Sequence, residues 1–295
     1  MFINENRDFI QNSINLNADQ TDSQTGQINN ALFLLLENPT DENIKKFRDV
    51  RDALIVGWLT DLLDNVKKDY FASAQIGIDV ADRQLKQKNK TKIVNKNIDK
   101  KTYTNKVNNY INSFTQDLNA IAESIKANSE KIIKELKSNP TANTLKEQKK
   151  ISSELVKQLK EKGITFFTDK IGRKIDIEKY IKMRVFTDTV SLQRTTYFVR
   201  AIQYGVDLVR IKHLNIHPTC ELCSPFENKI LSINGDVAGY MTIEEAESYG
   251  LFHPNCDHIP EELELEPIDK GGEGVIKLNK ENQKRFDYNQ KRNVI

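Results

Sequence analysis

The cysteine and histidine residues of this chain all lie within one short window of the sequence. The chain has 295 residues, with 3 cysteines and 4 histidines. In order along the chain they are His213, His217, Cys220, Cys223, His253, Cys256 and His258. Thiolate sulfur and imidazole nitrogen are the protein groups that bind zinc best. The window therefore predicts a metal site in this part of the chain.

The spacing inside this window groups the candidate ligands into two pairs. Cys220 and Cys223 are separated by two residues, and so are His253 and Cys256. Two intervening residues let a short turn aim both side chains at one ion, and two such turns supply a closed tetrahedral shell. His258 could replace His253 as the fourth ligand, so that choice stays open. We predict one structural Zn²⁺ per chain.

Other interpretations of the cysteines fit the sequence less well. A redox Cys-x-x-Cys pair normally opens a helix after a strand, in a chain that needs no second pair of ligands. A disulfide framework normally has an even number of cysteines and a secretory signal, whereas this chain has 3 cysteines. His217, three residues before Cys220, is a weaker ligand candidate than His253 or His258.

The sequence lacks the signatures of known zinc enzymes. Zinc deaminases require His-x-Glu and metalloproteases require His-Glu-x-x-His, and neither pattern occurs. Glu221 and Asp257 adjoin the cysteines, but we expect both at the surface. We therefore predict that the chain is not an enzyme. A zinc-dependent nuclease that uses His253 or His258 as a base is the least favoured alternative.

The composition favours long helices with exposed faces. Hydrophobic residues make up 38% of the chain and charged residues 29%, a low apolar share for one large core. The N-terminus does not resemble a signal peptide, and the longest apolar run, residues 31–36, is too short to cross a bilayer. We expect a soluble protein from a reducing compartment, with no membrane partner.

The first half of the chain is predicted to be helical after a polar start. Residues 1–30 show no clear apolar period, and we expect them to be mobile until a partner orders them. Residues 41–83 carry one apolar stripe at helical spacing, and a later helix is expected to end at Gly163. Residues 31–162 therefore form the predicted helical arm or bundle, to which we assign docking on a partner.

A heptad seam runs through the second half of this helical region. Apolar residues recur at spacings of four and three over residues 107–125 and resume at Ile132 and Leu136. Asn128 holds the skipped position, where a buried amide can fix the register of packed helices. We expect packing within the chain rather than a long intermolecular coiled coil.

A basic run separates the stripe from the seam and ends near Lys101. Its first cationic residues are Arg83, Lys86, Lys88, Lys90 and Lys92. It can be interpreted as a surface that contacts nucleic-acid phosphates or as a solvated connector. No aromatic residue interleaves the lysines, so nucleic-acid contact is kept as an alternative.

The second half of the chain is predicted to contain short strands as well as helices. The expected elements are a hairpin over residues 164–177, a helix ending at Gly205, strands at 206–213 and 229–233, and a short helix after Thr242. Residues 163–268 thus form a predicted zinc-binding α+β module, followed by a polar tail over residues 269–295. The predicted fold class is α+β, with an N-terminal helical arm or bundle before a small zinc-stapled module.

Three stretches of this module carry a family resemblance. Residues 250–258 are close to a Gly-Leu-x-His-Pro-Asn-Cys-Arg-His signature, and residues 217–229 and 172–183 look like two further segments of the same family. With these stretches the chain resembles the phage minor capsid protein 2 group, which is allied to the MuF-type head morphogenesis proteins. The resemblance covers roughly residues 163–260.

Two departures from the family pattern limit what can be transferred. The chain has Asp257 where the family usually has Arg after the motif cysteine. It offers Phe186 and Thr187 in the helix where the family tends to have Arg-Thr. The roles of those arginines cannot be carried over, whereas the zinc ligands are unaltered.

The resemblance implies a structural protein of a tailed-phage head. Such a protein would be present in few copies inside the head near the portal, and would aid assembly or accompany DNA on ejection. It would reside in the host cytoplasm during assembly and then in the virion. The implied partners are the portal protein and/or the inner capsid, with packaged DNA as a possible contact of the basic run. The alternative function is that of a nucleic-acid-binding zinc protein.

Overall fold

The structure is a computed structural model of the chain. It describes residues 2–37, 40–137, 166–168, 173–216, 218, 220–264 and 276–292. Two compact units are present, and each is built from segments that are far apart in the sequence. The first unit comprises Met1–Asn12, Lys68–Tyr110 and Phe186–Ile295, and the second comprises Ser13–Lys67 and Ile111–Val185. Each unit therefore takes residues from both sides of the expected division near Gly163.

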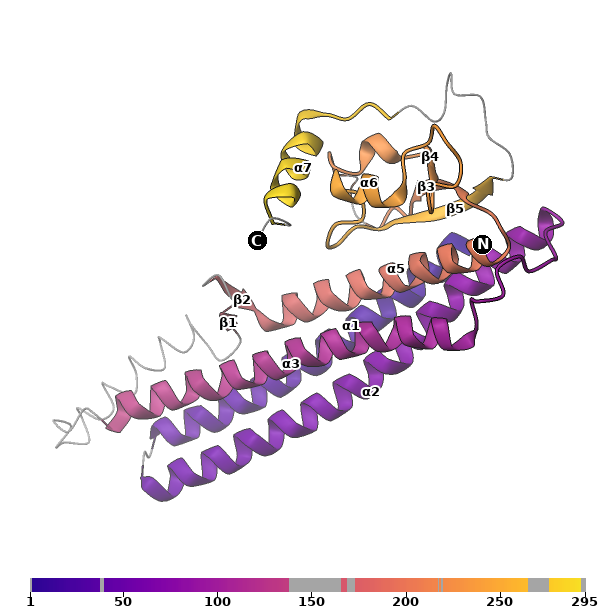
Figure 1. The fold of residues 1–295 in the computed structure, drawn as a ribbon. Helices are drawn as coiled ribbons and strands as arrows, with labels where there is room; N and C mark the ends of the chain where they lie inside the picture. The colour runs from indigo at the N-terminus through magenta and orange to yellow at the C-terminus, as the bar shows by residue number, and fades with distance from the viewer. Residues whose placement is uncertain are drawn as a thin grey trace. The chain divides into compact units, whose positions relative to one another are not determined.

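Four long helices account for most of the described chain (Figure 1). They are α1 (Phe2–Glu37), α2 (Asp41–Gln87), α3 (Lys100–Lys137) and α5 (Ile177–Gln203). Thr40 caps the start of α2, where its side-chain oxygen accepts a hydrogen bond from the Asn43 amide at 3.2 Å. No helix of the described residues is long and apolar enough to cross a membrane.

Residues 2–30, which we expected to be mobile until a partner orders them, lie within one helix, α1. The buried stripe of α1 in the second unit includes Asn17, Thr21 and Thr25, and each is at most 4% exposed. The hydroxyls of Thr21 and Thr25 donate to the carbonyls of the preceding turn at 2.8 and 3.0 Å. Small polar residues thus fill interior positions, and for that reason an apolar period is hard to see in the sequence.

Helix α3 confirms the predicted seam over residues 107–125, while the side chain of Leu136 lies outside the described part of the chain. Beyond Ile125, Ser129 and Ile133 are buried, at 0% and 2% exposure, rather than Asn128 and Ile132. The Asn128 amide instead donates to the Phe166 carbonyl at 3.3 Å. A change from heptad spacing to steps of four therefore turns the buried face of α3 by one residue.

The predicted hairpin is present in the second unit as β1 (Phe166–Thr168) and β2 (Lys174–Asp176), which pair antiparallel. Asp176 then caps α5, because its carboxylate accepts a hydrogen bond from the Lys179 amide at 2.9 Å. The hairpin thus leads directly into the helix, as the sequence predicts.

The first unit contains a three-stranded antiparallel sheet with the strand order β4-β3-β5. Its strands are β3 (Leu208–His213), β4 (Ile230–Ser232) and β5 (His258–Glu264). Strand β5 was not predicted from the sequence. Apolar residues of β3 and β5, such as Val209 and Leu263, are buried in one cluster with Leu85 of α2 and Tyr197 of α5. The predicted α+β class is confirmed.

Two short helices complete the first unit. Helix α6 (Ile243–Ser248) begins with the predicted capping box, in which the side chains of Thr242 and Glu245 each accept a hydrogen bond from the other residue's backbone amide. Helix α7 (Lys280–Arg292) lies in the segment expected to be a polar tail. The Asn282 amide of α7 donates to two backbone carbonyls, and Phe286 stacks on Tyr249 with ring centroids 4.7 Å apart. Part of this tail is therefore packed on the unit.

Candidate metal centre

Two tight turns of the first unit carry the candidate ligands. Cys220 and Cys223 lie between β3 and β4, where the Cys220 carbonyl accepts hydrogen bonds from the Cys223 and Ser224 amides at 3.2 and 3.0 Å. His253 and Cys256 lie between α6 and β5, and the Cys256 amide donates to the His253 carbonyl at 3.0 Å. Both turns thus place their two side chains on the same side, as the spacing predicts.

The second turn depends on a residue in the left-handed region. Asn255 has a φ of 63°, a conformation that Asn tolerates better than most residues. Its backbone amide donates to the Thr187 hydroxyl of α5 at 3.0 Å. This hydrogen bond fastens the turn to the helix, so the position of Cys256 is fixed from outside the turn as well as within it.

The structure brings all five predicted ligand residues together. The Cys220 Sγ and His253 Nε2 atoms are 3.0 Å apart, the Cys223 and Cys256 Sγ atoms 3.5 Å, and the Cys256 Sγ and His258 Nδ1 atoms 3.5 Å. The donor atoms of Cys220, Cys223 and His253 lie within 4.8 Å of one another, and so do those of Cys223, Cys256 and His258. Cys223 is common to both groups. His217 lies outside the described residues.

This donor set fits a zinc ion. Zinc–ligand bonds of about 2.0–2.3 Å in a tetrahedron place neighbouring donors about 3.3–3.8 Å apart, close to the sulfur contacts observed here. Cys223 and Cys256 are buried, and none of the three cysteines forms a disulfide. Buried thiols that converge without a disulfide are typical of a structural metal site. That a metal is bound stays a prediction.

Both histidines are oriented as metal ligands commonly are. The Nδ1 atom of His253 lies 2.7 Å from the Pro254 carbonyl oxygen, so Nδ1–H can donate there and leave Nε2 facing Cys220. The Nε2 atom of His258 lies 3.0 Å from a Glu227 carboxylate oxygen, which leaves Nδ1 facing Cys256. A partner on the far nitrogen fixes the tautomer and ring orientation of a ligand. The geometry therefore allows either His253 or His258 to be a metal ligand.

The Sγ atoms of Cys223 and Cys256 lie within hydrogen-bonding distance of each other, and either can be the donor. The pKa of Cys256 is lowered to about 3, chiefly by the hydrogen bond from Cys223 and also by His258 and Arg194, against the effect of burial. The same hydrogen bond, together with burial, raises the pKa of Cys223. A bound divalent cation favours the thiolate form of both residues, because the thiolate is the ligand.

Asp257 is not at the surface, in contrast to the expectation from sequence. It is 3% exposed, its Oδ1 lies 2.8 Å from His213 Nε2, and its Oδ2 accepts a hydrogen bond from the Ile216 amide. Pairing of β3 with β5 sets His213 opposite His258, next to Asp257, and the two imidazoles stack with centroids 4.7 Å apart. Asp257 and His213 thus contact each other next to the candidate ligand His258. Glu221 is exposed, as expected.

Comparison with family models supports the resemblance and extends it. The model of a family described as phage minor capsid protein 2 matches residues 20–262. The chain belongs to this family. The match includes all five candidate ligands and most of the helical half, whereas the resemblance read from the sequence began near residue 163. Comparisons with curated proteins and with solved structures found no match. Membership in a family of phage minor capsid proteins implies a location in the virion.

Sequence analysis of this minor capsid protein missed several contacts with the site, those of Glu227 and Thr187 and above all that of Arg194. Arg194 of α5 donates hydrogen bonds to the carbonyls of Cys256 and His258 at 3.3 and 3.0 Å. The family's Arg-Thr pair was sought at Phe186 and Thr187, but the sequence has an Arg-Thr pair further along the same helix, at residues 194–195. That pair was the available signal, since an arginine on an otherwise buried helical face needs a partner.

Proposed function

We propose that this chain is a non-enzymatic structural protein of a tailed-phage head, present in few copies inside the head near the portal, where it aids assembly or accompanies DNA on ejection. The family match over residues 20–262 is the observation that carries the proposal. Mass spectrometry of cross-linked, purified heads tests it. Cross-links to the portal protein are expected, and absence of the chain from intact heads would refute it.

We further propose that one structural Zn²⁺ stabilises the sheet of the first unit. Its ligands are Cys220, Cys223, Cys256 and one histidine, either His253 or His258. The two ligand-bearing turns precede different strands of a small sheet, so a shared ion cross-links them. Elemental analysis of protein purified without chelators should find about one zinc per chain. A protein free of metal would rule this proposal out.

The helical part of the second unit is proposed to dock on the portal or the inner capsid. A groove of about 290 Å³ between α1 and α2 is lined mostly by apolar side chains, among them Leu34, Phe47 and Val50. Leu34 and Val50 are 69% and 46% exposed at its edge. Exposed apolar surface of this kind commonly marks a protein-binding site.

A pair of matched variants tests this docking surface. Val50→Glu places a charge in the groove, whereas Val56→Glu places one at a position of α2 that is 63% exposed and does not line the groove. We expect Val50→Glu to lower incorporation into heads several-fold and Val56→Glu to have little effect. Equal incorporation of both variants would exclude the groove as the docking site.

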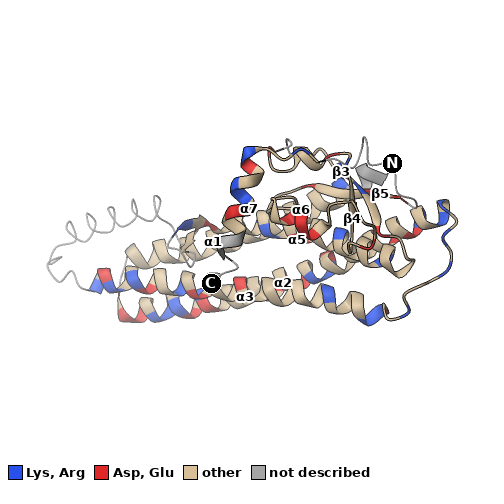
Figure 2. Cartoon of the chain, turned by 45° about the horizontal axis from the view of Figure 1, so that its top comes forward, with Lys and Arg blue, Asp and Glu red and all other residues tan. Residues whose placement is uncertain are grey.

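A second candidate function is contact with packaged DNA through the basic connector that joins α2 and α3. Lys90 and Lys92 are exposed in the connector and Lys86 is exposed in the last turn of α2, and Figure 2 shows basic residues along this segment. The connector is held in place by Gln203, whose carbonyl accepts hydrogen bonds from the Val94 and Asn95 amides at 2.9 and 3.0 Å. A positioned cationic loop can meet a phosphate backbone without a large loss of conformational entropy.

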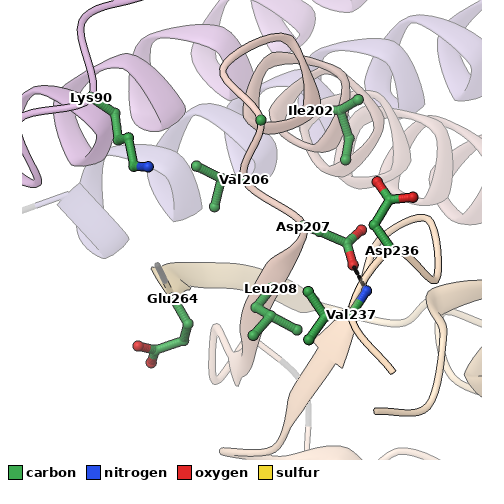
Figure 3. Close-up of a pocket in the computed structure, with 9 residues that line it drawn as sticks. Lys90, Ile202, Val206, Asp207, Leu208, Asp236, Val237 and Glu264 are labelled. Carbon is green, nitrogen blue, oxygen red and sulfur yellow. Dashed lines mark hydrogen bonds between the residues drawn. The ribbon is translucent and has the colours of Figure 1, made fainter. Parts of the chain in front are cut away.

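Lys90 differs from the other lysines in its surroundings. It lines a pocket of about 170 Å³ together with three carboxylate residues, Asp207, Asp236 and Glu264 (Figure 3). Nearby negative charge weakens attraction to phosphate, so Lys86 and Lys92 are the better candidates for DNA contact. Lys86→Gln/Lys92→Gln should weaken DNA binding and flatten its salt dependence in gel shifts, whereas Lys45→Gln/Lys131→Gln should not. Absence of salt-dependent binding by the unaltered protein would eliminate this function.

A further inference from the structure

Arg194 is a buried arginine that faces the candidate metal centre from α5. Its side chain is almost completely enclosed, with the residue only 4% exposed. The guanidinium donates to the carbonyls of Cys256 and His258 and to the Ser191 hydroxyl, at 3.3, 3.0 and 2.8 Å. It also lies over the ring of Phe252, 4.1 Å from the centroid. All of these contacts are with neutral groups.

A buried guanidinium surrounded by neutral groups is strongly unfavourable unless negative charge lies nearby. In the part of the chain that the structure describes, no carboxylate forms an ion pair with Arg194. By contrast, the buried guanidinium of Arg51 lies 2.8 Å from a Glu130 oxygen and 2.9 Å from an Asp52 oxygen. Glu247 of α6 attracts Arg194 electrostatically without forming an ion pair with it. The nearer source of negative charge is the cysteine cluster, because Arg194 donates to the carbonyl of Cys256 itself.

The charge of the metal centre depends on how many thiolates it contains. A divalent ion with three thiolates and one neutral imidazole carries a net charge of about −1, whereas two thiolates and two imidazoles leave it neutral. We propose that Arg194 is the counter-charge of a zinc centre with three thiolates and one histidine, and that it positions Cys256 and His258 through their carbonyls. This inference rests on the proposed zinc site.

The arrangement also explains why the arginine comes from α5. Hydrogen bonds to the carbonyls of Cys256 and His258 hold the backbone on both sides of Asp257, and the Thr187 hydroxyl of the same helix holds Asn255. Outer contacts of this kind orient metal ligands, and their loss typically lowers metal affinity about 10- to 100-fold. Helix α5 thus supplies both the charge and the alignment of the second ligand turn.

Chelator competition on the full-length protein tests the role of Arg194. Arg194→Met removes the charge and should lower zinc affinity about 10- to 100-fold. Arg194→Lys keeps the charge with fewer donors and should recover most of that affinity. The matched control is Arg200→Met on the same helix, because Arg200 pairs with Asp82 instead; its zinc affinity should be unchanged.

Zinc X-ray absorption on the unaltered protein supplies a second measurement that does not depend on any variant folding. Three sulfur ligands and one nitrogen ligand are expected, and two of each would overturn the inference. Unchanged zinc affinity in Arg194→Met, or equally weak binding by Arg194→Lys, would overturn it as well. A protein that binds no zinc at all would instead refute the proposed metal site on which the inference depends.

Discussion

Each of the two units of this protein contains a buried arginine, Arg51 in the second unit and Arg194 in the first, and the surroundings of the two guanidinium groups differ. In the second unit Arg51 and Arg48 share the carboxylate of Glu130, and the Arg51 guanidinium also donates to the Ser129 hydroxyl. In the first unit Arg194 faces carbonyls, an aromatic ring and a cysteine cluster. In the helical unit, the charge of Arg51 is therefore balanced by a carboxylate of the chain, that of Glu130. The sheet unit, by our proposal, balances Arg194 with the thiolates of the metal centre rather than with a paired carboxylate.

The largest expected effect comes from breaking the metal centre. Cys223→Ser, or removal of metal by a chelator, should unfold the sheet of the first unit, because structural zinc contributes about 10–16 kcal/mol in small peptides and whole domains are stable by only about 5–15 kcal/mol. Hydrogen exchange measured by mass spectrometry should show lost protection in β3, β4 and β5. The helices of the second unit should stay protected, since their cores contain no candidate ligand. Uniform loss of protection in both units would contradict the comparison.

The choice of histidine gives the next largest effect. By the equal spacing of the two turns, His253→Ala should lower zinc affinity more than His258→Ala, in a chelator competition assay. The reverse order would assign His258, whose ring is only 2% exposed and is held by Glu227. Small and equal losses would show that neither histidine is a ligand.

Helix packing in the first unit provides a third test. A Cβ added to Gly77 of α2 would lie 2.2 Å from the Gln193 carbonyl oxygen and 2.3 Å from the Thr196 hydroxyl of α5. Gly77→Ala should therefore destabilise this unit by about 1–3 kcal/mol through overpacking. Gly57→Ala in the second unit is the control, because nothing lies within 4 Å of its added Cβ. It should stabilise that unit by up to about 1 kcal/mol through helix propensity, in urea denaturation.

The smallest expected effect concerns the carboxylate of the second unit. The pKa of Glu130 is lowered to about 2, first by the hydrogen bond from Arg48 and then by that from Arg51. A lowered pKa means that stability is present above the ordinary value near 4.5 and is lost as the pH falls toward 2. Because the side chain of Glu130 is 39% exposed, we expect a contribution of only about 1 kcal/mol. Glu130→Gln should remove this part of the acid sensitivity, and an unchanged pH profile would count against the pairing.

Local signals in the sequence predicted several elements correctly. The Cys-x-x-Cys and His-x-x-Cys pairs, the capping box at Thr242 and the hairpin before α5 all appear in the structure. Gly205, expected at the end of a helix, has a φ of 70° just after α5. Such features depend on residues within a few positions of one another, and they can therefore be predicted without knowledge of the fold.

The sequence by itself determined the five candidate ligands, the apolar stripes and the α+β class. Only the tertiary structure decided the burial of polar residues. Thr21 of α1 occupies an interior position next to Trp58, and Asp257 is buried because pairing of β3 with β5 brings it to His213. Arg194 became part of the site because α5 meets a turn more than 50 residues later in the chain. A polar side chain is stable inside only when a distant segment supplies its partner, and no local pattern encodes that encounter.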